Sequence, residues 1–526
     1  MTRQNRKELL WVFVASTLIL LWGSIPTWAG YRAETDDLRF RGIYFDSQDY
    51  AVHISMMDAG KHGEIAYQFR FTTESHDPAY LRLFYVGLGH ISRLLNLSTE
   101  TTFQWARWLL GYVALLSLYQ LTRRIFHDLF WARTAFLLAT LGSGLGWLQL
   151  IFNWTSGPIT PIDFWLIDCY VFFSLSLFPH FAFVTAGMCI IIGLWLDYLE
   201  TPRWQSILWI TVTAVLVQLA NPIALATVDA GLVGATLASW WKGRRIRWRD
   251  IPALGVVAAT QLPLFAYNFI ILTNDPIWSQ FTAQNKTLSP SPEYYLWGFA
   301  PFLPFMVIGF IDFFRSRSKA SATSLFWIIS GVMLAYAPIF IQRRFLQNIT
   351  IPLAILAVHG LIRVFETRPA QSPAVKRWRS SLVILFVFAA SLSSIQLSLG
   401  RMLYLRTHPA DSYYPASLED AVAWLRNNVQ YNDFVLASEW TSQVLAQKSF
   451  VRVYLGHEME TLDYEGKQKI VTSFYEGGIE WLASAPIKWV VYGPYERTIN
   501  PGFNPADNLA LVYDTQDIKI YKVTDE

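Results

Sequence analysis

Residues 9–29 read LLWVFVASTLILLWGSIPTWA, an apolar run that closely follows Arg3, Arg6 and Lys7. A helix of this length crosses the roughly 30 Å hydrocarbon core of a bilayer. Cationic residues before such a run hold that end of the helix in the cytoplasm. The stretch therefore predicts a signal anchor with the N-terminus inside, and it makes a membrane protein the first hypothesis for the whole chain.

The composition of the 526 residues supports this hypothesis. Hydrophobic residues make up 53% of the chain and charged residues 15%, and there are 23 Trp, 25 Tyr and 36 Phe. The charged fraction of soluble domains is roughly 25%, so an ordinary soluble enzyme is excluded, as are disorder and a coiled coil. Abundant aromatic residues are typical of the two water interfaces of a polytopic membrane protein.

Ten more apolar runs are long enough to be membrane-spanning helices. With the first run they predict eleven crossings, and the ten runs are 106–122, 129–151, 179–199, 205–221, 223–241, 251–273, 294–314, 322–341, 349–366 and 381–402. Clusters of Arg and Lys such as Arg123 with Arg124 fall in alternate loops, which are then cytoplasmic. We expect a multi-pass protein of the cytoplasmic (inner) membrane, with its N-terminus inside and its C-terminal part outside.

The chain divides by charge near residue 402. Residues 403–526 carry 10 Lys and Arg against 17 Asp and Glu, whereas the remainder carries 32 against 22. We predict a transmembrane module over residues 1–402 and a soluble extracytoplasmic α/β domain over 403–526. In this domain we expect helices at 417–429 and 464–476 and five short strands, which are FVLAS, VRVYLG, KWVVYG, LALVYD and IKIYKV.

The first external loop, about 30–104, predicts two juxtamembrane helices. One runs from Ser47 to Ala59, with Asp46 or Ser47 as its N-cap and Gly60 as its stop signal, and the other from Pro78 to Leu95. A further apolar stretch, Ile162–Phe178, would place neighbouring basic loops on opposite sides if it crossed. We expect it to be re-entrant or interfacial and to line a cavity, because irregular backbone at that depth needs a protein or water lining. A twelfth crossing is the alternative.

Arg343 and Arg344 are the cations that break the charge pattern, because they fall on the outer side of the predicted topology. A guanidinium pair at the outer leaflet is costly unless it meets an anion, and its planar donors suit a phosphate. We infer a phosphate-binding site. The alternative is that both side chains reach toward lipid headgroups or pair with a loop carboxylate.

The first external loop supplies the candidate acid. Asp49 and His53 are separated by four residues and share one helix face, and a carboxylate there could accept a proton from a hydroxyl. Asp49 is therefore the predicted catalytic base, with Asp46 and His53 as further site candidates. Equally, Asp46 and Asp49 would serve as caps that complement the helix dipole.

Four other residues complete the set of site candidates. Glu74 and His76 follow in the same loop, and Asp163 and His180 bracket the predicted re-entrant stretch. Each is explained equally well as a loop residue, a helix cap or an interfacial histidine. No tight spacing of His, Asp or Glu fixes a metal site, although the residue types would suit a divalent metal, and we expect no tightly bound cofactor. Gly456-His457-Glu458 in the tail is interpreted as a structural turn.

Several motifs together resemble the GT-C fold glycosyltransferases, in particular uncharacterised bacterial members of that class. They are Asp49-Tyr50, Thr73-Glu74, FYVGLGHISRLLNLS at 84–98, GSGLGWL at 142–148, PIDFW at 161–165 and RRFLQNITIPLAILA at 343–357. The resemblance covers almost the whole chain. It implies transfer of a sugar from a polyprenyl-phosphate donor at the outer face of the membrane, with Asp49 as the base and Arg343 or Arg344 as the phosphate ligand.

The same resemblance limits the acceptor. The tail has no WWD sequence, which disfavours an oligosaccharyltransferase and its metal dependence. The first loop has Asp46-Ser-Gln-Asp49 where protein mannosyltransferases and lipid A aminoarabinose transferases have adjacent Asp and Glu. The acceptor therefore stays open among a glycan, a lipid and a protein, and the sugar among hexoses and pentoses.

Two hypotheses of other classes remain. A transporter or flippase would use the arginines to move a lipid-linked anion, but the chain has no internal repeat of the kind found in many transporters. A non-catalytic scaffold would use the acidic domain as a binding module and would need neither Asp49 nor the arginines. Besides the bilayer and a lipid-linked sugar, no nucleic-acid partner is expected, because no basic patch with interleaved aromatics occurs.

Overall fold

The structure is a computed structural model, and it forms two compact units, each assembled from separate stretches of the chain. It describes residues 3–153, 160–366, 372–478, 481–482, 485–505 and 507–524. Unit 1 contains residues 1–25, 106–268 and 286–400, and unit 2 contains residues 26–105, 269–285 and 401–526. The first external loop, which the sequence analysis assigned to the transmembrane module, thus belongs to the same unit as the C-terminal tail.

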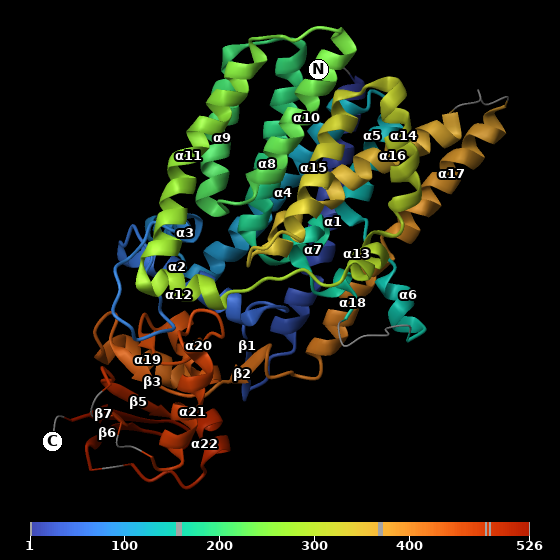
Figure 1. The fold of residues 1–526 in the computed structure, drawn as a ribbon. Coiled ribbons are helices and arrows are strands. Elements are labelled where there is room, and N and C mark those ends of the chain that lie inside the picture. Colours follow the sequence, from blue (N-terminus) through green and yellow to red (C-terminus); the bar gives the residue numbers. More distant parts are fainter. Residues whose placement is uncertain are drawn as a thin grey trace. The chain divides into compact units, whose positions relative to one another are not determined.

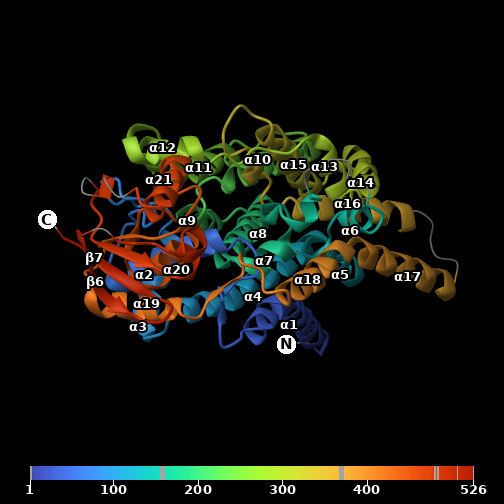
Figure 2. The ribbon, with the colours of Figure 1, turned by 90° about the horizontal axis from the view of Figure 1, so that it is seen from below.

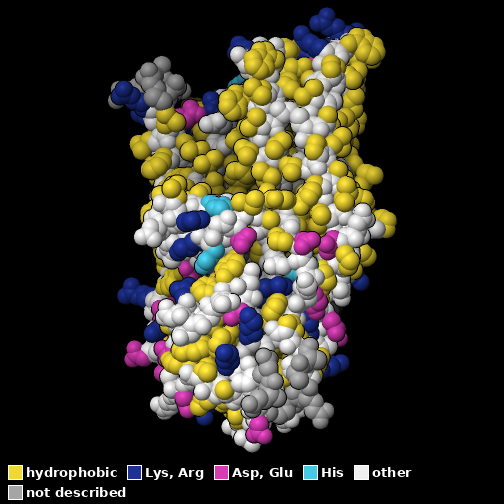
Figure 3. Space-filling model, turned by 90° about the vertical axis from the view of Figure 1, so that its left-hand side faces the viewer, with side chains coloured by type: hydrophobic (Ala, Val, Ile, Leu, Met, Phe, Trp, Pro, Cys, Tyr) yellow, Lys and Arg dark blue, Asp and Glu magenta, His cyan; other side chains and the backbone are white. Residues whose placement is uncertain are grey.

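Within the described residues, four helical spans are long and apolar enough to cross a membrane. They are Arg6–Arg32 within α1 (Arg3–Arg32), α8 (Pro179–Glu200), α11 (Asp250–Asn274) and Pro373–Leu405, which joins α17 (Pro373–Ala390) to α18 (Leu392–Leu405). Large apolar side chains such as Leu262 and Phe265 are exposed on α11. Figure 3 shows hydrophobic side chains covering much of the upper surface on one face. Such exposed apolar area is typical of contact with lipid.

Helices also occupy the other predicted crossings, in shorter or less uniformly apolar form. They are α4 (Thr99–Ile125), α5 (Leu129–Leu141), α9 (Trp204–Ala220), α10 (Leu225–Gly243), α15 (Lys319–Ala335) and α16 (Thr350–Glu366). In unit 1, α10 packs along α15, and α14 (Leu303–Ser316) packs along α16 (Figure 1). The mostly helical fold is as predicted, whereas the number of crossings stays a prediction.

Two predicted crossings are not continuous helices. The run 129–151 is interrupted after Gly142, and a short helix, α6 (Gly146–Ile151), follows α5. The run 294–314 bends by 88° between α13 (Pro292–Phe299) and α14. Pro301 and Pro304 lie at this bend, where each lacks the backbone N–H that a continuous helix needs.

The stretch Ile162–Phe178 is irregular, as predicted. It contains two single-turn 3-10 helices, η1 (Ile162–Phe164) and η2 (Ile167–Cys169), and the seven-residue helix α7 (Val171–Leu177). At 1.5 Å per residue α7 is about 10 Å long, much too short to cross a bilayer alone. Side chains throughout α7 are buried within unit 1.

Unit 2 combines the predicted loop helices with the predicted α/β domain. α2 (Ser47–His62) begins after Asp46 as predicted, whereas α3 (Leu83–Leu95) begins five residues later than predicted. A two-stranded antiparallel sheet pairs β1 (Leu38–Phe40) with β2 (Tyr413–Pro415), and so joins the loop to the tail.

A five-stranded sheet forms the core of the tail, and all five predicted strands are present. In spatial order they are β4 (Arg452–Val453), β3 (Phe434–Leu436), β5 (Trp489–Tyr492), β7 (Lys519–Val523) and β6 (Leu509–Asp514). The first three are parallel, and β7 is antiparallel to both of its neighbours. The tail helices are α19 (Leu418–Asn428), α20 (Glu439–Lys448), α21 (Tyr464–Tyr475) and α22 (Pro494–Ile499). α19 and α20 contact each other (Figure 2), and α20 is not among the predicted helices.

Candidate active site

The first turn of α2 presents Asp49. Asp46 is the N-cap, with φ of 59°, and its side chain accepts a hydrogen bond from the backbone N–H of Asp49 at 3.4 Å. Asp46 therefore has the capping role that the sequence analysis gave as its alternative. The side chain of Asp49 remains 45% exposed, so its carboxylate is accessible.

Asp49 contacts a buried histidine from the tail within unit 2. His457 Nε2 lies 3.2 Å from Asp49 Oδ1, and the imidazole is only 5% exposed. The backbone N–H groups of Met459 and Glu460 both donate to Nδ1, at 3.0 and 3.1 Å. Because Nδ1 accepts, the ring proton lies on Nε2 and is donated to Asp49.

The electrostatic environment of His457 is set by opposing effects. Burial alone lowers its pKa, but the hydrogen bond and the charge of Asp49 outweigh this effect and raise the pKa above its ordinary value. The two backbone donors at Nδ1 work in the other direction, because a proton there would displace both hydrogen bonds. His457 is thus held as a donor to Asp49 by contacts on both of its nitrogen atoms.

A second carboxylate, that of Glu460, is buried close to Asp49 and His457. Glu460 is buried and forms an ion pair with Arg82 at 3.0 Å, and the hydroxyl of Tyr67 donates to it at 2.9 Å. Burial raises the pKa of Glu460, although Arg82, His457 and the Tyr67 hydrogen bond oppose the shift. Since both of its oxygens have partners, Glu460 supports the His457 loop and is not exposed for chemistry.

The loop that carries His457 is fixed by contacts to other segments of unit 2. Thr461 Oγ1 donates to the carbonyl of Phe71 at 2.8 Å and accepts from the backbone of Gly456 and His457. Gln284, the last residue of α12 (Pro276–Gln284), donates to the carbonyls of Met459 and Thr461 at 2.6 and 2.9 Å. The turn predicted at Gly456–Glu458 is therefore also a rigid support for Asp49.

The remaining candidates in the first loop have structural contacts. His53 stacks on Tyr85 with ring centroids 4.0 Å apart. Glu74 forms an ion pair with Lys467 at 2.7 Å; burial raises the pKa of Glu74, but this cation and Thr72 lower it overall. His76 Nδ1 donates to the carbonyl of Glu74, and its Nε2 accepts from the N–H of Phe69. These contacts explain the three residues as parts of the loop framework.

In unit 1, Arg343 and Arg344 lie on a short 3-10 helix, η3 (Gln342–Leu346). Both side chains are half-buried, and the Arg343 guanidinium lies 5.1 Å from the ring centroid of Trp165. Arg343 Nε is buried and has no hydrogen-bond partner among the described residues. Its backbone N–H donates to the carbonyl of Thr287 at 3.1 Å, which fixes the segment. Arg343 therefore retains donor capacity that a bound anion would use.

Asp163 is fully engaged within unit 1. Its oxygens accept from the backbone N–H groups of Gly144 and Gly146 at 3.1 and 2.7 Å, from Tyr170 at 2.7 Å and from Ser393 at 2.9 Å. A Cβ at Gly146 would lie 2.4 Å from Asp163 Oδ2, so only glycine permits this approach. These contacts explain why the GSGLGWL and PIDFW motifs occur together, and they give Asp163 a structural role.

His180 lies in the first turn of α8, where its ring contacts the rings of Phe178 and Phe181 at 5.8 and 4.1 Å between centroids. This is an aromatic packing position. Across the part of the chain that the structure describes, no group of three or more His, Cys, Asp or Glu side chains is arranged to hold a metal ion.

Sequence reasoning missed the partners of Asp49. His457 is 408 residues away from Asp49, and Arg82 is 378 residues away from Glu460. No periodicity connects residues at such separations. The available signal is Gly456-His457-Glu458 in an otherwise acidic tail, a sequence that by itself indicates a structural turn.

Comparisons with known proteins show which solved structures have a similar fold. No family model and no curated protein matches the chain. Among solved structures, it is similar to the apo oligosaccharyltransferase of Archaeoglobus fulgidus, at 12% identity and a TM-score of 0.54, over 92% of this chain and 69% of that one. ArnT from Cupriavidus metallidurans bound to undecaprenyl phosphate is similar at 11% identity and a TM-score of 0.51, over 97% and 98% of the two chains.

A complex of Archaeoglobus fulgidus AglB with an inhibitory peptide and a dolichol-phosphate is also similar, at 12% identity and a TM-score of 0.51, over 91% of this chain and 69% of that one. At these identities the likeness is one of fold. The resemblance expected from the motifs is confirmed at that level, and the chain has the GT-C fold of polyprenyl-phosphate-dependent glycosyltransferases.

Proposed function

We propose that the protein is an inverting glycosyltransferase that moves a sugar from a polyprenyl phosphate to an acceptor hydroxyl at the outer face of the cytoplasmic membrane. The observation that carries this proposal is the half-exposed carboxylate of Asp49, held by the buried His457 in a GT-C fold. A partly exposed carboxylate that a fixed donor orients is suited to accept a proton.

In the proposed reaction, the acceptor hydroxyl oxygen attacks the anomeric carbon of the donor sugar while Asp49 takes its proton. The bond between the anomeric carbon and the phosphate oxygen breaks, and the lipid phosphate leaves with the bonding electrons. Attack opposite the leaving group inverts the anomeric centre and needs no second catalytic carboxylate. Because the phosphate is a stable anion, no general acid is required. His457 acts as a positioning residue that orients the Asp49 carboxylate.

Arg343 and Arg344 are the proposed ligands of the donor phosphate. The support is the unsatisfied Nε of Arg343 and the fixed backbone of η3. Cations at this position stabilise the negative charge that grows on the phosphate as the glycosidic bond breaks, and removing one such group costs about 10²- to 10³-fold in turnover. The bilayer supplies the lipid-linked donor. The acceptor is a glycan, a lipid or a protein with a free hydroxyl.

The test is a transfer assay with purified protein in lipid vesicles and a radiolabelled polyprenyl-phosphate sugar. Hydrolysis or transfer supports the enzyme, binding alone supports a transporter, and neither supports a scaffold. Arg343→Ala and Arg344→Ala should each reduce turnover by about 10²-fold or more. Arg245→Ala, on an exposed basic loop, is the matched control and should have no effect. Full transfer by Arg344→Ala or by Asp49→Asn would refute the assignment.

A further inference from the structure

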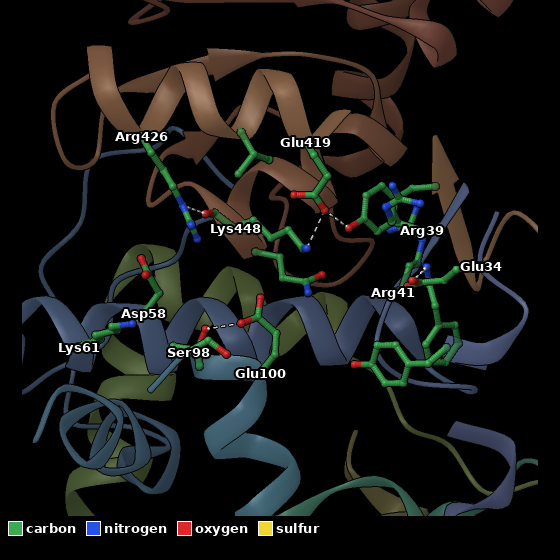
Figure 4. A pocket seen from close by; sticks show the side chains of 17 residues that line it. Glu34, Arg39, Arg41, Asp58, Lys61, Ser98, Glu100, Glu419, Arg426 and Lys448 are labelled. Carbon is green, nitrogen blue, oxygen red and sulfur yellow. Dashed lines mark hydrogen bonds and ion pairs between the residues drawn. The ribbon is translucent and has the colours of Figure 1, made fainter. Parts of the chain in front are cut away.

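Unit 2 contains a cavity that the proposed reaction does not use. Its volume is about 380 Å³, within the range of small-molecule sites. Its lining comes from β1, α2, the start of α4, β2, α19 and α20, and Figure 4 shows Arg426 and the pair Arg39 and Arg41 toward opposite sides of the view. All of these segments belong to the same unit.

The lining carries five cations, Arg39, Arg41, Lys61, Arg426 and Lys448, and four carboxylates, Glu34, Asp58, Glu100 and Glu419. Arg39 donates to the carbonyls of Thr35 and Leu38, Lys61 to that of Leu97 at 2.9 Å, and Arg426 to that of Lys448. Carbonyl oxygens satisfy these hydrogen bonds but bring no negative charge. Among the described residues, an ion pair with a carboxylate forms only at the fifth cation, Lys448, which meets Glu419 at 2.8 Å.

Arg41 also forms no ion pair with a carboxylate among the described residues, and its side chain is buried. Its side chain is 2% exposed, yet its Nε and Nη2 atoms have no hydrogen-bond partner among the described residues. Gln443 accepts from Nη1 at 3.3 Å, the ring faces of Tyr414 and Trp440 pack against the group, and Tyr495 and the charge of Asp411 also interact with it. A buried guanidinium with open donors is expensive unless an anion approaches it.

The rest of the lining suits hydroxyl groups and sugar rings. Tyr31, Phe40 and Tyr414 contribute aromatic side chains. Among the described residues, the carboxylates of Glu34 and Glu100 accept hydrogen bonds from local donors, the N–H of Phe40 at 3.0 Å and the hydroxyl of Thr99 at 3.2 Å. An ionised carboxylate has about four acceptor positions, so each can take further hydrogen bonds from hydroxyls.

We propose that this cavity binds a saccharide that bears an anionic group, a phosphate or a carboxylate. The anion meets the pair Arg39 and Arg41, and the hydroxyls meet the carboxylates of the lining, whereas Arg426 lies toward the opposite side of the view. The site is separate from the reacting carboxylate, because Asp58 and Lys61 lie nine and twelve residues after Asp49 on α2, about 14 and 18 Å along the helix. The proposal concerns binding and does not depend on the transferase reaction.

The experiment measures binding of three probes to full-length protein in nanodiscs by calorimetry: glucose 1-phosphate, glucuronate and glucose. The two anions should bind, with the stronger one identifying the preferred group, and glucose should bind at least about tenfold more weakly, the worth of a hydrogen bond to a charged group. Arg39→Gln should weaken the binding of the anions by a similar factor, and Arg426→Gln should weaken it less, because Arg426 lies toward the opposite side of the view. Arg41→Gln tests the buried group.

Arg406→Gln, an exposed arginine of unit 2 outside the cavity lining, is the matched control and should bind as the unchanged protein does. If Arg41→Gln does not fold, the two more accessible variants still decide the question. Equal binding of glucose and the anions, equal losses in Arg406→Gln and Arg39→Gln, or no binding at millimolar probe would each overturn the proposal. Asp49→Asn should bind all probes unchanged, which separates this site from the proposed reaction.

Discussion

Asp49 in unit 2 and Asp163 in unit 1 are both aspartates in the first turn of a helical segment, but their surroundings differ. Asp163 is 3% exposed, and four donors from four residues occupy its two oxygens. Asp49 is half-exposed and receives a fixed donor from His457 at one oxygen. The buried carboxylate of Asp163 serves the fold, whereas the half-exposed carboxylate of Asp49 can be reached by a substrate.

Replacing Asp49 gives the largest expected effect. Asp49→Asn keeps the size of the side chain but removes the proton acceptor, so turnover should fall by about 10²- to 10⁴-fold. The thermal unfolding midpoint should stay the same, because the carboxylate is half-exposed. Transfer assays and thermal unfolding of the same preparation measure the two quantities. Asp36 is also exposed and serves as the control. An equal loss of turnover in Asp36→Asn would show that the effect is not specific to Asp49.

The opposite pattern is expected for Asp163. Asp163→Ala leaves the backbone N–H groups of Gly144 and Gly146 without their acceptor in a buried place, and each unsatisfied donor costs about 1–3 kcal/mol. The hydroxyls of Tyr170 and Ser393 keep the carbonyls of Gly298 and Gly144 as acceptors. We expect the free energy of unfolding to fall by about 3 kcal/mol or more. Unfolding in detergent measures this change, with Asp197→Asn, which breaks a partly exposed ion pair with Arg124, as the control of small effect. A stable Asp163→Ala protein would contradict the structural role.

His457 tests whether one fixed donor matters for Asp49. His457→Ala should lower turnover by about tenfold or more, since a hydrogen bond to a charged group is lost. The acidic limb of the pH–rate profile should move to higher pH, because a carboxylate that loses a donor holds its proton more strongly. His457→Gln retains an N–H donor and should recover part of both effects. A fall in turnover without a shifted profile would indicate a purely structural role.

The smallest effect concerns His76 and the stability of unit 2. Burial lowers the pKa of His76 below its ordinary value, although Glu74 opposes the shift. As the pH falls below about 6.5, the unfolded chain binds a proton at His76 before the folded chain does, so folding becomes less favourable. Above that pH the residue has no such effect. His76→Gln should therefore flatten the loss of stability between pH 7 and 5, as measured by thermal unfolding. An unchanged slope would exclude this contribution.

Local patterns predicted much of the fold. Short apolar strand patterns predicted the five tail strands, and an N-cap residue predicted the helix that begins at Ser47. The alternation of basic loops along the chain predicted the irregular stretch at 162–178. α20 was missed, because its sequence EWTSQVLAQK is too polar to show an apolar stripe. The break at Gly142 and the 88° bend near Pro301 coincide with a glycine and a proline in the sequence. A hydropathy average over a whole apolar run does not detect such single residues.

The residues of the candidate site stay predictions. The position of Asp49 in the outer loop makes it a candidate base, yet its partner His457 comes from a contact that no local pattern encodes. Asp163 is a candidate because it lies beside an apolar stretch. Its burial and its four donors, supplied by residues from 144 to 393, are properties of the fold that the sequence does not reveal.

The order of the chain has a consequence for biosynthesis. Unit 2 draws its strands and loops from both ends of the sequence, and β1 pairs with β2 across more than 370 residues. A ribosome therefore releases the acid-bearing helix early, while the imidazole that secures it emerges only near the end of translation. A chain shortened before residue 457 would therefore contain Asp49 without the histidine that donates to it.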